Sequence, residues 1–203
     1  MKVNKFIILI LVCVQCLLVA CSPIKPNVTN QYKLDSYSGK KLSPRLTRQS
    51  ILITQPEAVT GYQTDQMLYV KKPFEISSFA NSAWIGPPAD MLYPLILQSV
   101  QRSGYFYAVA SSPNAEQTNY RLDTQLLTLQ QNFMTSPSEI ILTAKVVLTN
   151  VVNSKVVASK VISQRVRCSM ESPYGGVIAA NQATKKLTSE LSHFIVTEVK
   201  RDK

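Results

Sequence analysis

Few side chains in this chain of 203 residues are suited to chemistry. His193 is the only histidine, which excludes a zinc site built on two or three histidines, and any Ser-His-Asp or Cys-His arrangement must use that ring. The six glycines form neither GxGxxG nor a Walker A loop, and the serines lie in neither GxSxG nor SxxK. The twelve acidic residues lie in no catalytic motif, and Asp90 is interpreted as a helix-capping group. The sequence therefore predicts no catalytic residue, no metal site and no cofactor, and favours a binding or assembly protein.

One of the four cysteines, Cys21, directly follows an apolar segment. Two lysines precede that segment, and its length of about 15 residues is short of the roughly 20 that a membrane-spanning helix needs. Residues 1–20 are therefore predicted to be a cleaved export signal. The run Leu18-Val19-Ala20-Cys21 resembles the lipobox of bacterial lipoproteins, which implies cleavage between Ala20 and Cys21, a diacylglycerol on the thiol and an acyl chain on the amine. The alternatives are an ordinary secretory signal with an accidental cysteine, or a short membrane helix.

Cleavage and lipidation would change the rest of the chain in two ways. Removal of Lys2 and Lys5 lowers the net charge from +10 to +8, and Cys168 becomes the only free thiol, which we interpret as a small buried hydrophobe. Ser22 follows the modified cysteine. In the sorting pattern of Gram-negative lipoproteins, which this N-terminus resembles, aspartate at that position favours retention in the inner membrane. Serine favours the outer membrane, with the domain on its periplasmic face.

Two regions follow the signal. Residues 21–31 contain two prolines and no hydrophobic periodicity, so they are predicted to be the lipidated N-terminus and a tether, which reaches roughly 30 Å when extended. Residues 32–203 are predicted to form one periplasmic domain.

The hydrophobic pattern of this domain predicts an α+β fold, with a mostly antiparallel β-sheet and two α-helices packed on one face. Helices are expected at 89–103, where Pro94 either lies in the first turn or kinks the helix, and at 173–201. Asn153-Ser154 is expected to be a two-residue hairpin turn. Strands are expected at 49–54, 66–71, 74–80, 105–110, 119–133, 139–152 and 155–171.

Basic pairs give the domain candidate contact sites. Lys71-Lys72, Arg165 with Arg167, and a pair at 185–186 are candidates for contact with anionic lipid headgroups or an acidic partner, and the alternative is that each is an ordinary solvated surface. A nucleic-acid partner is not expected, because an exported lipoprotein does not meet nucleic acid and the chain has no recognition motif.

One stretch of the chain indicates a particular protein family, which the composition alone does not. The segments are Ser50–Ala58, Gly61-Tyr62, Thr64, Met67, Tyr69-Val70, Phe79–Asn81, Trp84, Pro87–Leu92, and Ser103-Gly104 with Phe106. Together with the lipobox they resemble the auxiliary lipoprotein family of ABC-type transport systems. The resemblance implies an antiparallel sheet backed by two helices and no catalytic motif. It also implies that the protein works with a permease, an ATPase and a mammalian-cell-entry-type substrate-binding protein, which together move lipids between two membranes.

Four aromatic residues are candidates for contact with a partner or a lipid: Tyr62, Tyr69, Phe79 and Trp84. The alternative is that Phe79 and Trp84 simply close the edge of the sheet. The expected function is a non-catalytic, membrane-anchored accessory subunit of an ABC-type lipid transport system, which docks a mammalian-cell-entry-type protein and forms a homo-oligomer. The rival interpretations are a stand-alone periplasmic lipid-binding carrier and a structural envelope lipoprotein.

Overall fold

The computed structural model describes residues 29–111 and 118–202, so the predicted signal, Cys21 and most of the predicted tether lie outside the described residues. The described chain is α+β, as expected. Its elements are β1 (Asn30–Tyr32), β2 (Ser50–Ile53), β3 (Glu57–Ala58), β4 (Gln66–Lys72), β5 (Glu75–Trp84), α2 (Pro88–Arg102), β6 (Ala108–Ser111), β7 (Tyr120–Asn132), β8 (Glu139–Asn150), β9 (Lys155–Arg167) and α3 (Pro173–Arg201).

Strand β7 lies at the centre of a nine-stranded sheet in the described chain. On one side it pairs along its whole length with β8, which pairs in turn with β9, and both pairings are antiparallel. On the other side it pairs in succession with β2, β3 and β4, and all three pairings are parallel. The β1–β5 and β2–β6 pairings are also parallel. The expectation of a mostly antiparallel sheet therefore holds for the long strands, whereas the sheet as a whole is mixed.

Alternation along the long strands separates two faces of the sheet. Leu142, Ala144, Val146 and Leu148 of β8 are fully buried, while the residues between them are partly or fully exposed. The same period of two residues places Ile162 of β9 beside Ala144 on the buried face. The β8–β9 connection spans residues 151–154 rather than the two residues expected. These strands therefore present one apolar face to the helices and one largely polar face, which also carries Val147 and Val161, to the outside.

Helix α2 starts one residue earlier than expected, with Pro88 in its first turn. Pro94 lies inside the helix, so it is not a first-turn residue. Asp90 does not cap the helix; its carboxylate accepts a hydrogen bond from Gln55 Nε2 at 2.9 Å. Gly104 follows the helix at φ +68°, the left-handed conformation that glycine adopts without steric cost.

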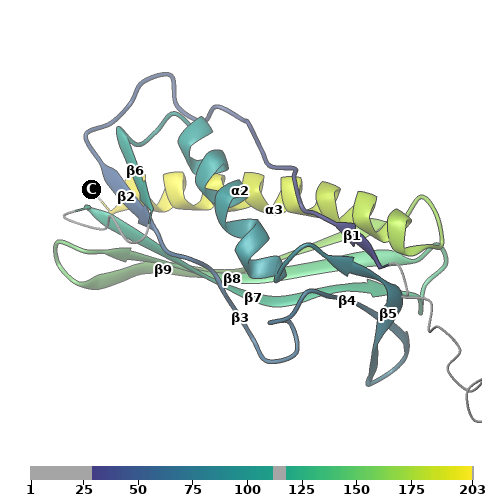
Figure 1. Ribbon diagram of the computed structural model, residues 1–203. Coiled ribbons are helices and arrows are strands. Elements are labelled where there is room, and N and C mark those ends of the chain that lie inside the picture. The colour runs from purple at the N-terminus through teal and green to yellow at the C-terminus, as the bar shows by residue number, and fades with distance from the viewer. Residues whose placement is uncertain (1–28, 112–117, 203) are drawn as a thin grey trace, which may run out of the picture.

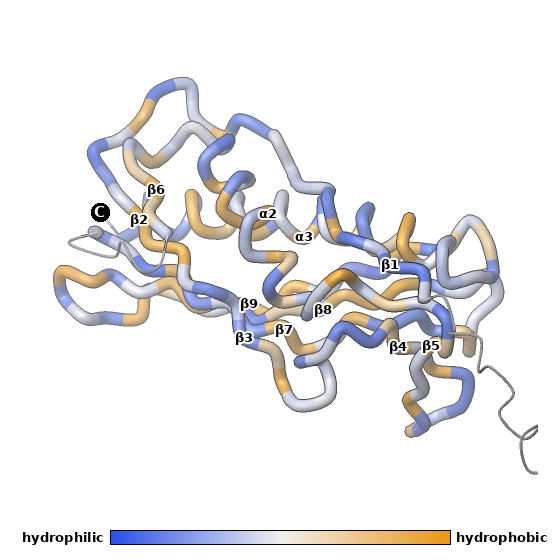
Figure 2. The backbone as a smooth tube through the Cα atoms, in the orientation of Figure 1, coloured by the Kyte–Doolittle hydropathy of each residue, from blue (hydrophilic) through white to orange (hydrophobic). Residues whose placement is uncertain are grey.

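Helix α3 has the bounds that the sequence predicts and lies against β8 and β9. Both helices cover the same face of the sheet (Figure 1), and hydrophobic positions recur along the helices and the strands beneath them (Figure 2). Ser99 of α2 donates a hydrogen bond to the Thr188 carbonyl of α3 at 3.1 Å. The first turn of α3 lies so close to its surroundings that a Cβ on Gly175 would overlap the backbone of Met170.

Candidate functional site

Two of the predicted contact residues meet at one end of the sheet. The rings of Tyr69 and Phe79, on β4 and β5, lie 4.6 Å apart between centroids, and Phe133 lies 5.9 Å from Tyr69 and 6.3 Å from Phe79. We call these three residues the aromatic cluster. The Lys71 Nζ lies 5.1 Å from the Tyr69 centroid and 5.7 Å from the Phe133 centroid, within the range of a cation–π contact.

Phe133 is a member that the sequence did not indicate. It directly follows β7, and its amide donates a hydrogen bond to the Val70 carbonyl at 2.8 Å. This contact depends on the parallel pairing of β4 with β7, in which Tyr69 lies opposite Gln131. The local sequence pattern does not predict a pairing between strands that lie about 60 residues apart in the chain.

Tyr62 lies in the loop between β3 and β4. Its hydroxyl donates to Gln130 Oε1 at 2.6 Å, and burial raises the pKa of this phenol above its usual value. The side chain is therefore held against β7 by its own hydrogen bond, whereas Tyr69 and Phe79 contact each other.

Trp84 has a different environment from the one predicted for a contact residue. It is the last residue of β5, pairs with Tyr32 of β1, and is only 2% exposed. Its amide donates to the Asp65 carbonyl at 2.8 Å. This burial contradicts the contact-surface interpretation of Trp84 and favours the structural alternative, because the indole lies in the hydrophobic core.

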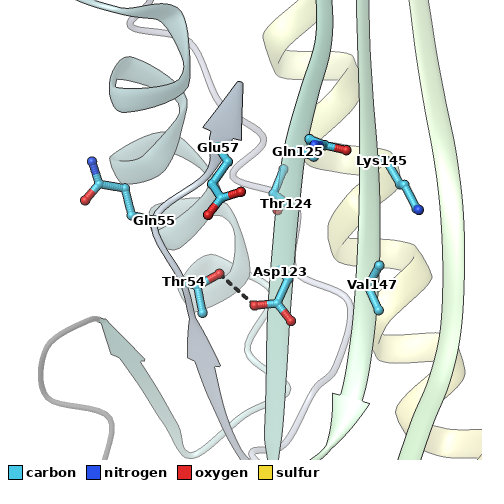
Figure 3. A pocket seen from close by; sticks show the side chains of 8 residues that line it. All are labelled: Thr54, Gln55, Glu57, Asp123, Thr124, Gln125, Lys145 and Val147. Carbon is cyan, nitrogen blue, oxygen red and sulfur yellow. Dashed lines mark hydrogen bonds between the residues drawn. The ribbon is translucent and has the colours of Figure 1, made fainter. Parts of the chain in front are cut away.

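A shallow hollow of about 430 Å³ lies where the chain after β2 crosses β7 (Figure 3). Asp123 lies at its base and uses both carboxylate oxygens: one accepts from Thr54 Oγ1 at 3.1 Å, and the other pairs with Arg121 Nε at 2.9 Å. A carboxylate with both oxygens engaged is a structural group rather than a free general base. The lining residues are Thr54, Gln55, Glu57, Asp123, Thr124, Gln125, Lys145 and Val147.

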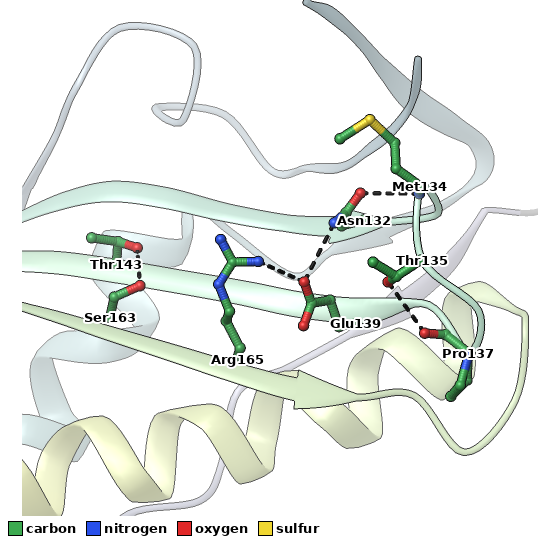
Figure 4. A network of polar contacts seen from close by, with 8 residues as sticks. All are labelled: Asn132, Met134, Thr135, Pro137, Glu139, Thr143, Ser163 and Arg165. Atoms are coloured by element: carbon green, nitrogen blue, oxygen red, sulfur yellow. Dashed lines mark hydrogen bonds and ion pairs between the residues drawn. The ribbon is translucent and has the colours of Figure 1, made fainter. Parts of the chain in front are cut away.

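The face of β7, β8 and β9 opposite the helices carries a polar network (Figure 4). Glu139 Oε1 accepts from Arg165 Nη1 at 2.6 Å and from Asn132 Nδ2 at 3.4 Å, which links the three strands. Thr143 and Ser163 share a hydroxyl hydrogen bond of 2.9 Å. Such a face suits a hydrated contact with another protein better than burial in an apolar interior.

The two side chains with the most reactive chemistry do not form a site. Cys168 is 4% exposed, which confirms the expected buried thiol, and burial raises its pKa and so disfavours the nucleophilic thiolate. His193 is exposed on α3. Within residues 29–111 and 118–202, no group of three or more His, Cys, Asp or Glu residues is arranged to hold a metal ion. No helix in this part of the chain has the length and apolar character needed to cross a membrane.

A family model described as the ABC-type transport auxiliary lipoprotein component matches residues 32–192. The chain belongs to this family. The match covers almost all of the folded domain, which confirms the family expected from the sequence. A search of curated proteins finds no match to the chain.

Solved structures have the same fold as this family member. Protein XCC0632 from Xanthomonas campestris has a TM-score of 0.75 and 19% identity, covering 85% of this chain and 98% of its own. An uncharacterized protein has a TM-score of 0.66 and 11% identity, covering 83% and 99%. The hypothetical protein CT253 from Chlamydia trachomatis has a TM-score of 0.53 and 7% identity, covering 75% and 98%. At these identities the likeness is one of fold alone.

Proposed function

We propose that the protein is a non-catalytic, membrane-anchored accessory subunit of an ABC-type system that moves lipids between the inner and outer membranes. The observation that carries the proposal is the family match over residues 32–192. The domain docks a mammalian-cell-entry-type substrate-binding protein at the periplasmic face of the outer membrane, where several copies assemble. This interpretation assigns the domain a binding role and no chemical step.

The packing between the sheet and the helices favours docking over lipid carriage. Leu142 and Leu148 of β8 and Leu187 and Leu191 of α3 are fully buried in one continuous core. A carrier needs an apolar chamber large enough for an acyl chain, and ligand chambers are typically several hundred Å³ in volume. The hollow at Asp123 lies on the opposite, polar face of the sheet. The partner is therefore expected to bind the outside of the domain.

The polar face of β7, β8 and β9 is the surface that we assign to the protein partner. It displays Arg165 at 60% side-chain exposure, together with the paired hydroxyls of Thr143 and Ser163. Neither helix covers this face of the sheet (Figure 1). The rim of a protein interface is typically polar and hydrated, so such a face can bind a protein without being unstable when free.

The anchor in this proposal is Cys21. Three acyl chains on this residue contribute about 0.8 kcal/mol for each buried methylene, which makes attachment effectively permanent. Ser22 directs the protein to the outer membrane. The tether then allows the domain to stand away from the headgroups and meet a partner that spans the periplasm.

The test is an in-cell crosslinking pull-down from separated inner and outer membranes, with a tag after Lys203. The wild-type chain is expected in the outer-membrane fraction and to bring down a mammalian-cell-entry-type protein. Cys21→Ala removes the lipidated thiol and is expected to release the chain from the membrane. Cys168→Ala is the matched control, because it also removes a cysteine but leaves the anchor in place.

The docking surface is tested in the same experiment. Arg165→Glu reverses an exposed charge on the polar face and is expected to reduce recovery of the partner without changing fractionation. Lys185→Glu makes the same change on α3 and is expected to leave recovery unchanged. A wild-type protein that is anchored but recovered alone, or with lipid only, would refute the accessory role and favour the structural or carrier interpretation.

A further inference from the structure

The β4–β5 hairpin ends in an exposed phenylalanine that the fold does not use. Phe74 is fully exposed, and Ile76 beside it is 56% exposed. Phe74 has a φ of +65° and is the second residue of a two-residue turn, a position that favours glycine because other side chains are strained there. The side chain thus adds strain and contributes no burial to the domain. A role for it must come from something outside the described chain.

The base of the hairpin is joined to the rest of the sheet, which sets where its tip lies. The aromatic cluster lies beneath it, and the Phe133 amide joins the end of β7 to Val70 of β4 at 2.8 Å. Met134, the next residue, is 52% exposed and adds a third apolar side chain near the hairpin. Phe74, Ile76 and Met134 therefore lie at the same end of the sheet, and we call them the apolar tip.

Two lysines lie next to the apolar tip in the β4–β5 hairpin. Lys71 lies against the rings of the aromatic cluster, and Lys72 is 75% exposed and forms a weak 3.8 Å pair with Glu75. Exposed aromatic and aliphatic side chains next to lysines are typical of segments that enter the headgroup region of a membrane, where the ammonium groups meet lipid phosphates.

Strand β1, which begins the described part of the chain, lies at this same end of the molecule. Strand β1 runs parallel to β5, with Asn30 opposite Ser82, so its N-terminal end is directed toward the beginning of β5 and the hairpin (Figure 1). Ser82 and Phe74 are at most about 26 Å apart, at roughly 3.3 Å per strand residue, because the pairing of β5 with β4 is irregular between Ser78 and Ala83. From Asn30 back to Cys21 the chain can reach about 30 Å. The proposed lipid anchor can therefore lie level with the apolar tip.

We propose that the apolar tip inserts into the headgroup region of the membrane that holds the anchor, and so fixes the orientation of the domain on the bilayer. Two attachments at one end, the acyl chains and the hairpin, prevent free rotation about the tether. The inference rests on the lipid anchor in the proposed function but not on the transport partner. It can be tested on vesicles that contain no other protein.

The experiment uses the full lipidated protein in vesicles of phosphatidylethanolamine and phosphatidylglycerol, with a tryptophan as a depth reporter. Phe74→Trp places the reporter at the apolar tip. Val152→Trp is the matched control, because Val152 is 77% exposed in the β8–β9 turn at the opposite end of the domain. The native Trp84 is buried and contributes the same background to both variants. Lipids brominated on their acyl chains quench a tryptophan that enters the bilayer.

The expected result is at least threefold stronger quenching at position 74 than at position 152, with a blue shift of emission at position 74 that requires vesicles. Equal quenching at the two positions, or none at either, would overturn the proposal. A blue shift that occurs without vesicles would also overturn it, because a second copy of the chain would then be covering the tip.

A second variant separates insertion from folding. Phe74→Gly removes the side chain and relieves the left-handed strain, so the midpoint of thermal unfolding is expected to stay the same or rise. In membranes, the same variant is expected to make the hairpin more accessible to protease than in the wild-type protein. Equal cleavage of the two proteins, or a lower unfolding midpoint for Phe74→Gly, would contradict the role of this side chain.

Discussion

A hydrogen bond joins the residue after α3 to the sheet, and a substitution that deletes a single oxygen atom removes it. The hydroxyl of Tyr120, on β7, donates to Asp202 Oδ2 at 3.0 Å, and Asn150 Nδ2 donates to the same oxygen at 2.7 Å. Tyr120 is 4% exposed, whereas Asp202 is exposed. Because Asn150 and water still solvate the carboxylate after Tyr120→Phe, we expect a loss of about 1 to 1.5 kcal/mol at pH 8, at the lower end for a bond to a charged group.

The same bond predicts a pH dependence. Burial, with a contribution from Asp202, raises the pKa of Tyr120 to about 12 from a usual value of 10. The folded state therefore holds this proton more tightly than the unfolded state. The resulting stabilisation is fully present below pH 10 and is lost as pH rises through 12. The wild-type protein should thus lose stability above pH 10 more steeply than Tyr120→Phe.

The measurement is urea unfolding of both proteins between pH 8 and pH 11. Raising the pH from 10 to 11 lowers the free energy of unfolding of the wild-type protein by at most about 1.4 kcal/mol, and solvent screening near Asp202 makes the loss smaller. The difference between the two proteins should therefore fall by roughly half by pH 11. Tyr107→Phe is the control, because Tyr107 is 61% exposed and its hydroxyl is expected to contribute little. A difference that does not change with pH, or a neutral Tyr120→Phe, would refute the reasoning.

Three other predictions concern packing. Gly175→Ala should destabilise the domain by about 1 to 3 kcal/mol, because its Cβ overlaps the Met170 backbone, whereas Gly86→Ala meets open space and should be near neutral; chemical unfolding compares them. Leu142→Ala should cost about 2 to 5 kcal/mol in the same assay, because it opens a cavity at a fully buried position, and a smaller cost would mean that the site collapses. The Cys168 thiol should react with a disulfide reagent at least tenfold faster in urea than in buffer; equal rates would contradict its burial.

The elements that the sequence predicted well are those with a long local repeat. Helix α3 has the expected bounds because its apolar stripe recurs over 29 residues, and Ser172 caps it by accepting from the Gly175 amide at 3.1 Å. The starts of β8 and β9 were also predicted, because apolar and polar side chains alternate along these strands of 12 and 13 residues and place the apolar ones in the core. The prediction of a two-residue turn was wrong because Val151 and Val152, which follow β8, are β-branched residues that favour a strand, so composition alone does not show where the pairing stops.

The features that the sequence did not predict depend on distant pairing. Strands β1 and β3 have three and two residues, which is too short for any repeat, and the parallel pairings of β2, β3 and β4 join segments that lie far apart in the chain. The same limit applies to the candidate site. Tyr69 and Phe79 are hairpin neighbours and were grouped correctly, whereas Phe133 joins them only through the β4–β7 pairing. For Trp84 the sequence left a structural and a contact interpretation open, because the short strand β1, which pairs with the end of β5, has no pattern that would have decided between them.

The central position of β7 also constrains the order in which the sheet can form during synthesis. Strands β2, β3 and β4 have their partner residues on β7 at Tyr120–Leu122, Gln125-Leu126 and Gln130–Asn132, some 60 to 70 residues later in the chain. In a chain that emerges N-terminus first, β4 can pair with β5 and β2 with β6, but β3 and one edge of both β2 and β4 have no partner strand until β7 follows. Contacts of such long sequence separation form slowly, and unpaired strand edges aggregate. The N-terminal half of the domain is thus the part most prone to aggregate before synthesis is complete, and it cannot complete its sheet as a fragment.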